Sequence, residues 1–232
     1  MKIAIVTGIW KRFEVFEMFA KGVHELEKIK GIELITIVAG SEGVKSKKVV
    51  ENHNFHYIEM PNQPLATKMN STLLLAKAMN VDYVLCLGSD DVIHIDLMKK
   101  YIELMRQDFD FVGVLDFYFY DTISRTSIYW GGYRDVRRID HTCGAGRLLS
   151  KRLLDKWNWI IWENKHSHIL DNSMQEKLAA TPHSSYIFSL QAFDLYGLDI
   201  KSETNMTPFA LWDNTNYIEN NIIFEKFKFL FN

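Results

Sequence analysis

The sequence predicts an α/β fold in which a mostly parallel central sheet carries helices on both faces. Two observations lead to this prediction. Short β-branched runs alternate with helical apolar spacing through residues 1–105, and each run ends at glycine or proline. Strands joined by helices lie parallel in one sheet, because each helix returns the chain to the edge where the previous strand began. No linker interrupts the chain, so we expect one domain over 1–232.

The individual elements follow from local pattern. Phe16, Phe19 and Val23 recur at the spacing of one buried helix face. After residue 105 the pattern changes, and 111–120 and 125–133 look like aromatic-rich strands and loops. The expected strands are 3–6, 33–39, 57–60 and 83–87. The expected helices are 13–29, 44–52, 65–79 and 95–105.

Composition excludes several classes of protein. With 47% hydrophobic and 24% charged residues, the chain is too apolar to be largely disordered. A formal charge of −2 gives no overall field that would mark a general nucleic-acid or membrane binder. Two cysteines, Cys86 and Cys143, cannot alone form a metal-thiolate cluster. Neither a signal-like segment nor an apolar span of 18 residues is present, so we expect a cytoplasmic protein.

Asp90 and Asp91 directly follow the expected buried strand 83–87. Ligands of parallel sheets bind beyond the carboxyl ends of the strands, where these carboxylates would lie. Carboxylate pairs suit a divalent cation, which can in turn bridge phosphate oxygens, so we expect Mg²⁺ or Mn²⁺. The alternative is that Asp90 caps the following helix and Asp91 is solvated. The position at a strand end favours the metal.

The segment 64–79, followed by 82–91 (DYVLCLGSDD), resembles the GT-A glycosyltransferases, particularly the family 2-like enzymes that use nucleotide-sugars. Their asparagine-bearing helix leads into a strand and an acidic DxD-type motif. The resemblance implies a single GT-A, Rossmann-like domain with a donor half, 1–105, and an acceptor half, 106–232. One departure is Gly88, which stands where the family often has an acidic residue.

The same resemblance implies roles for residues of the donor side. It implies Asp91 as the metal ligand and a nucleotide-sugar, most simply a UDP-sugar, as the donor. Lys68 has the alternative of a surface lysine that lies along its helix. Lys201 is a weaker candidate for neutralising the charge of the leaving group. The residues expected to contact the nucleotide-sugar are Thr7, Gly8, Trp10, Arg12, Glu42, Lys68, Asn70, Asp90 and Lys201.

A second resemblance lies in the loop 141–150 (HTCGAGRLLS) and the later Leu170-Asp171-Asn172. In these enzymes a glycine-containing acceptor loop runs into a helix, and a later acidic residue is the catalytic base. This implies Asp171 as the base of an inverting transfer, which must accept the proton of the acceptor hydroxyl. The alternative is that Asp171 caps a helix. Gly144 and Arg147 are then expected on the acceptor side.

Residues 125–152 hold seven basic side chains and two acidic ones, in a chain of net negative charge. Tyr129, Trp130 and Tyr133 lie among them, and arginine with aromatic neighbours suits phosphates and stacked bases. The pattern makes a DNA acceptor bound by Arg134, Arg137 and Arg138 credible, and the chain looks compatible with phage enzymes that glycosylate hydroxymethylated pyrimidines in DNA. A glycan acceptor is an equal alternative. The arginines could instead pair with surface acids or hold the donor diphosphate.

Two other function classes stay open. A nucleotidyltransferase that makes nucleotide-sugars favours a glycine-rich, basic loop after the first strand. The segment 7–12 (TGIWKR) carries Lys11 and Arg12 but only one glycine, which argues against it. A non-catalytic module that binds carbohydrate or nucleic acid is the second alternative. It would never release nucleoside diphosphate from a nucleotide-sugar.

Overall fold

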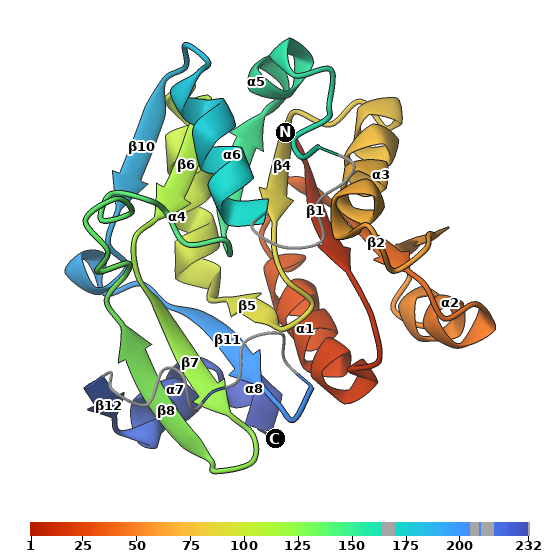
Figure 1. The fold of residues 1–232 in the computed structure, drawn as a ribbon. Helices are drawn as coiled ribbons and strands as arrows, with labels where there is room; N and C mark the ends of the chain where they lie inside the picture. The colour runs from red at the N-terminus through yellow and green to blue at the C-terminus, as the bar shows by residue number, and fades with distance from the viewer. Residues whose placement is uncertain (164–169, 205–208, 210–215, 232) are drawn as a thin grey trace.

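The computed structural model describes residues 1–163, 170–204, 209 and 216–231, and within them the chain forms two sheets covered by helices (Figure 1). The larger sheet has seven strands in the order β10-β6-β9-β4-β1-β2-β3. These strands are β1 (Lys2–Gly8), β2 (Glu33–Gly40), β3 (His56–Glu59), β4 (Tyr83–Cys86), β6 (Phe111–Val114), β9 (Arg147–Ser150) and β10 (Ser185–Phe188).

The larger sheet is mostly parallel, as the sequence predicts. The pairings among β1, β2, β3 and β4 are all parallel, and so is the pairing of β6 with β10. Only β9 among these strands is antiparallel, to both β4 and β6. Its first residue, Arg147, pairs with Cys86 at the carboxyl end of β4. The chain therefore enters β9 from the sheet edge at which ligands of parallel sheets bind.

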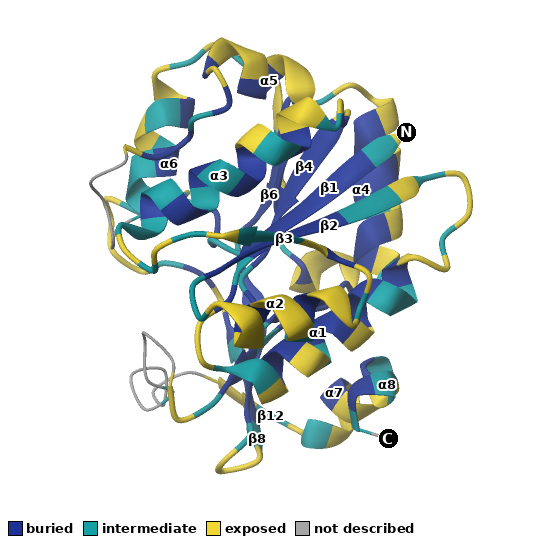
Figure 2. Ribbon diagram, turned by 90° about the vertical axis from the view of Figure 1, so that its right-hand side faces the viewer, coloured by how far each residue is buried: buried dark blue, intermediate teal, exposed yellow. Residues whose placement is uncertain are grey.

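Helices cover both faces of this sheet, because alternate side chains of each strand point to opposite sides. Ile3 and Ile5 belong to one buried cluster with α1 and α4, whereas Ala4 and Val6 belong to another with α3, α5 and α6. Figure 2 shows the buried strands between α3 and α4. The helices are α1 (Phe13–Leu26), α2 (Val44–Glu51), α3 (Leu65–Ala78), α4 (Ile95–Arg106), α5 (Lys151–Lys156) and α6 (Leu170–Ala179).

A second sheet of five strands was not predicted. Its order is β12-β8-β7-β11-β5, and three of its four pairings are antiparallel. Two short C-terminal helices, α7 (Asn220–Lys226) and α8 (Lys228–Phe231), pack their apolar side chains against it. The strands are β5 (Asp91–Ile93), β7 (Phe117–Asp121), β8 (Thr126–Trp130), β11 (Gly197–Lys201) and β12 (Asn216–Ile218).

The short strand β5, which was not predicted, lies between the acidic pair and the helix that the sequence predicts over 95–105. Val92 and Ile93 continue from Asp91 as a strand, and α4 begins at Ile95. His94 caps α4 by accepting a hydrogen bond from the main-chain N–H of Asp96, so Asp90 is not the cap. No helix in the described part of the chain is long and apolar enough to span a membrane.

Candidate functional site

Three carboxylates meet beyond the carboxyl end of β4. Asp90 and Asp91 lie at the start of β5, and Asp199 lies opposite Asp91 in the antiparallel pairing of β5 with β11. One oxygen of each residue lies within 4.8 Å of an oxygen of the others. Oxygen ligands this close together are the kind that Mg²⁺, Mn²⁺ and Ca²⁺ bind. The second sheet thus supplies a third carboxylate that sequence analysis did not place here.

Burial and mutual repulsion disfavour the ionised forms of two of these carboxylates. Burial, followed by the charges of Asp199 and Asp90, raises the pKa of Asp91 well above its ordinary value. Burial also raises the pKa of Asp199 to about 6, although the ammonium of Lys201 opposes this shift. A divalent cation would remove the repulsion and keep the carboxylates ionised.

The donor atoms of this cluster fit such a cation. Asp91 Oδ2 accepts a hydrogen bond of 2.5 Å from the main-chain N–H of Gly88. Asp199 Oδ2 accepts one of 2.6 Å from Lys201 Nζ. Asp199 Oδ1, in contrast, is buried and has no hydrogen-bond partner among the residues that the structure describes. Leaving a carboxylate oxygen buried and unpaired is costly, so this atom is suited to bind a metal ion.

Two basic side chains flank the cluster, and both are among the predicted donor residues. Arg12 Nη1 lies 2.5 Å from Asp90 Oδ2, and Lys201 Nζ lies 2.6 Å from Asp199 Oδ2. Burial alone would lower the pKa of Lys201, but the charges of Asp199 and Asp90 raise it. Three ionised carboxylates and two cations leave one net negative charge, which favours binding of a further cation.

Lys68 connects the loops that follow β1, β2 and β3. Its ammonium donates to Ile9 O at 2.6 Å, to Asn62 Oδ1 at 3.1 Å and to Ser41 Oγ at 3.2 Å. The residue is 1% exposed, and burial lowers its pKa to about 8. The alternative of a solvated surface lysine is therefore wrong. Lys68 holds the predicted nucleotide loops in one arrangement.

The other residues expected on the nucleotide side lie in or beside these loops. Glu42 accepts a hydrogen bond of 2.8 Å from the main-chain N–H of Lys11, which joins the loops after β1 and β2. Trp10 is 43% exposed in the first of these loops. Thr7 is buried with an unpartnered hydroxyl, considering only the described residues, and Gly8 packs beside α3. The structure thus brings these residues together at one sheet edge, and their contacts with a donor stay predictions.

Asn70 occupies a different environment. Its amide nitrogen donates to Trp162 O at 2.7 Å, and its amide oxygen accepts from the main-chain N–H groups of Ile161 and Trp162 at 3.1 and 3.3 Å. The side chain therefore holds the 161–162 segment against α3. The predicted contact of Asn70 with a nucleotide-sugar stays untested.

Asp171 lies in the first turn of α6, and its carboxylate is 44% exposed. Arg147 Nη1 lies 3.3 Å from Asp171 Oδ1, and the Tyr133 hydroxyl lies 3.5 Å from Asp171 Oδ2. Arg147 itself is 1% exposed and also donates to the carbonyl oxygen of Thr142 at 2.8 Å. The buried Arg147 therefore orients the carboxylate of Asp171 from the protein interior. The burial of Arg147 argues against the predicted direct contact of this arginine with an acceptor.

The Asp171 region and the acid cluster lie at the same sheet edge. Arg147 pairs with Cys86 at the end of β4, two residues before Gly88. Burial raises the pKa of the Cys143 thiol and Arg147 opposes that rise, while Asp91 and Asp171 both act to raise it further. Cys143 is thus within electrostatic reach of both carboxylates. An exposed carboxylate and a group of carboxylates suited to a cation therefore lie at one edge of the sheet.

The carboxylate of Asp171 packs directly against Gly144. A Cβ at position 144 would lie 2.5 Å from Asp171 Oδ1 and 2.9 Å from Oδ2, so we expect Gly144→Ala to displace the carboxylate. On the sequence-based expectation that Asp171 is the base of a glycosyl transfer, the variant should lose at least about tenfold in transfer rate with unchanged donor affinity, because small misplacement of a catalytic group is costly. Gly131→Ala is the matched control, since its Cβ would meet nothing closer than 3.5 Å. Equal rates for the two variants would remove Gly144 from the site.

The basic residues of 125–152 do not form one surface, which corrects the sequence-based expectation. Arg147 is buried, and Arg152 forms ion pairs of 2.7 Å with Asp108 and Asp110 at the opposite end of β9. Arg125 lies in the turn between β7 and β8. The remaining arginines lie in the loop before β9: Arg134, Arg137, which pairs with Asp135, and Arg138, which lies over the ring of Tyr133.

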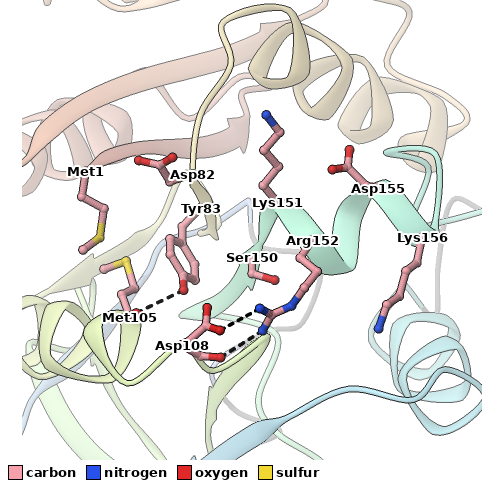
Figure 3. A pocket seen from close by; sticks show the side chains of 10 residues that line it. All are labelled: Met1, Asp82, Tyr83, Met105, Asp108, Ser150, Lys151, Arg152, Asp155 and Lys156. Carbon is pink, nitrogen blue, oxygen red and sulfur yellow. Dashed lines mark hydrogen bonds and ion pairs between the residues drawn. The ribbon is translucent and has the colours of Figure 1, made fainter.

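A cavity of about 630 Å³ lies at the opposite edge of the larger sheet (Figure 3). It is lined by Tyr83 at the start of β4 and Ser150 at the end of β9, so it lies away from the acid cluster. Its cationic side chains are already bound: Arg152 to Asp108, Lys151 to Asn80 and Lys156 to Pro182 O. Because each of these three side chains already has a partner, the cavity gives no reason to place the functional site there.

Comparison with solved structures identifies the fold. Over 88% of its length the chain resembles Staphylococcus aureus TarS 1-349 in complex with UDP-GlcNAc, with a TM-score of 0.64, 14% identity and 60% of that chain covered. It also resembles a mannosyltransferase of Pyrobaculum calidifontis in complex with GDP-Man and Mn²⁺, with a TM-score of 0.59 and 11% identity, covering 90% of this chain and 59% of that one. A bifunctional IspDF of Campylobacter jejuni follows, with a TM-score of 0.52, 13% identity, and 82% and 50% covered.

These likenesses confirm the predicted fold class, a GT-A, Rossmann-like α/β arrangement with a mostly parallel central sheet. The chain spans about 60% of the length of the TarS 1-349 and mannosyltransferase chains described above. No protein-family model and no curated protein matches the sequence.

Proposed function

We propose that the protein transfers a glycosyl group from a nucleotide-sugar to a hydroxyl of an acceptor. The observation that supports this most is the acid cluster of Asp90, Asp91 and Asp199, which stands beside the loops after β1 and β2 at the edge where Asp171 also lies. Two solved structures of the same fold carry UDP-GlcNAc or GDP-Man, the second with Mn²⁺.

In this proposal the first three loops bind the nucleotide. Lys68 fixes their relative positions, and the exposed ring of Trp10 offers a surface on which a base can stack. Arg12 orients Asp90, and the acid cluster binds Mg²⁺ or Mn²⁺. The bound ion supplies positive charge next to the departing diphosphate. Lys201, buried beside Asp199, adds a second positive charge to the same region.

Asp171 serves as the general base. Its exposed carboxylate accepts the proton of the acceptor hydroxyl as that oxygen attacks the anomeric carbon. Arg147 holds the carboxylate in place through its contact of 3.3 Å with Asp171 Oδ1. With a base opposite the leaving diphosphate, the sugar is transferred in one displacement and the anomeric configuration inverts. A UDP-sugar is the donor that this proposal tests first.

The acceptor is proposed only as a compound with a free hydroxyl. The other arginines of 125–152, Arg125, Arg147 and Arg152, lie apart from the loop that holds Arg134, Arg137 and Arg138, so the basic surface is smaller than the count along the chain suggests. The loop before β9 still presents exposed Arg134 and Arg137, and Tyr133 of the same loop contacts Asp171 at 3.5 Å. These side chains suit an acceptor with a carboxylate or a phosphate, and a glycan stays an equal candidate.

A screen of UDP- and GDP-sugars with Mn²⁺ tests this function. Released nucleoside diphosphate should appear with one donor even without acceptor, because water can replace the acceptor slowly, and excess EDTA should stop the release. A nucleotidyltransferase would instead release pyrophosphate from a nucleoside triphosphate and a sugar phosphate. Absence of diphosphate release with every donor, together with normal donor binding, would show a binding module rather than an enzyme.

A further inference from the structure

Two histidines far from the acid cluster face each other on the surface. His24 lies in the last turn of α1, and His53 lies just after α2. His24 Nε2 and His53 Nδ1 are 3.3 Å apart. The outer nitrogens of both rings contact carboxylates: His24 Nδ1 lies 2.8 Å from Glu27, and His53 Nε2 lies 3.0 Å from Glu17.

The carboxylates assign the protons on the two rings. An ionised carboxylate only accepts hydrogen bonds, so His24 Nδ1 and His53 Nε2 must each carry a hydrogen. In the neutral rings the hydrogen-free nitrogens are then His24 Nε2 and His53 Nδ1. Two hydrogen-free ring nitrogens 3.3 Å apart repel each other, and a proton or a metal ion bound by both would remove that repulsion.

The separation of the nitrogens matches a metal ion better than a shared proton. Charge-assisted hydrogen bonds shorten to roughly 2.7–2.9 Å, whereas these nitrogens are 3.3 Å apart. Two nitrogens bound to a tetrahedral zinc ion at about 2.0–2.1 Å are separated by about 3.3–3.4 Å. We therefore propose that His24 and His53 bind a divalent transition-metal ion of the zinc type, with water completing its coordination.

The surroundings hold the pair in this geometry. Phe55 packs against both rings, with centroid distances of 5.4 Å to His24 and 5.6 Å to His53. Glu17 and Glu27 are the carboxylate partners that metal-binding histidines commonly have, and their two charges balance a divalent ion bound by neutral rings. A bound ion would tie the end of α1 to the turn after α2.

Zinc titration by calorimetry tests the proposal, in excess Mg²⁺ so that the oxygen-rich acid cluster is occupied. We expect the full chain to bind one more equivalent of Zn²⁺ than His24→Asn or His53→Asn. His56→Asn is the matched control, because His56 is an exposed histidine on the neighbouring strand β3, and it should bind as the parent does. Equal stoichiometry in all four proteins would overturn the site.

A measurement on the unchanged protein covers the case in which a variant fails to fold. In ¹⁵N NMR spectra, Zn²⁺ should shift the resonances of His24 Nε2 and His53 Nδ1 and leave their other nitrogens protonated. If Zn²⁺ leaves both resonances in place while acid shifts them, the two rings share a proton and the metal site does not exist.

Discussion

Asp91→Asn should lower metal-supported transfer by roughly 10³-fold, because a bound cation contributes several kcal/mol to stabilisation of the leaving group and each 1.4 kcal/mol is about tenfold. Asparagine keeps the shape of the side chain and can still accept the hydrogen bond from Gly88. Steady-state release of nucleoside diphosphate, measured over a range of Mn²⁺ concentrations, checks the result. The defect should persist at saturating donor.

The control for this variant is Asp96→Asn, which removes an exposed carboxylate that pairs with Lys99 on α4. It should transfer at the parent rate.

Thermal unfolding of the Asp91→Asn protein supplies a second readout. The raised pKa of Asp199, about 6, means that the metal-free fold loses stability as pH rises toward 6, because the folded protein holds the proton longer than the unfolded chain. Burial, followed by the charges of Asp199 and Asp90, also raises the pKa of Asp91, so Asp91→Asn removes a second group that costs stability as the pH rises and should lessen the loss. A fully active Asp91→Asn protein would exclude the acid cluster from the reaction.

Asp171→Asn should lower the transfer rate by about 10²–10⁴-fold, the usual contribution of a general base. Donor affinity should change little, since Asp171 lies on α6 beside Arg147 and away from the loops that Lys68 connects. Single-turnover transfer at saturating donor, paired with a separate donor-binding titration, distinguishes the two effects.

Glu176→Gln is the control on the same helix, because Glu176 is an exposed acid of α6. Its transfer rate should equal that of the parent. A near-normal rate for Asp171→Asn would move the base to another carboxylate. In that case Arg147→Met, which removes the cation that orients Asp171, should also leave the rate unchanged.

The first half of the fold could be predicted from sequence because its signals are local. Phe16, Phe19 and Val23 mark a helix by spacing alone, and β1 to β4 appear with their ends displaced by at most a few residues. The strand β5 could not be recognised, since Asp91–Ile93 is shorter than any periodic pattern. The five-stranded sheet depends on pairing between β5 and β11, which nothing local encodes.

Prediction of the candidate site from the sequence was limited in the same way, to residues that form a local motif. Asp90 and Asp91 could be found because adjacent carboxylates after an apolar strand form a visible motif, whereas Asp199 is a single acid within an ordinary strand. The basic segment failed as a predictor for a related reason. Charge counted along the chain ignores that β9 carries Arg147 and Arg152 to opposite ends of the sheet.

The register of β5 with β11 has a consequence for the stage of synthesis at which the acid cluster can form. Asp199 is synthesised long after Asp90 and Asp91. A nascent chain that has formed only β1 to β4 therefore lacks one of the three carboxylates of the acid cluster. The proposed affinity for a cation therefore requires the pairing of β5 with β11 in the second sheet. Ions present during synthesis would stabilise only the finished molecule, and so would act on the yield of folded protein rather than on its early intermediates.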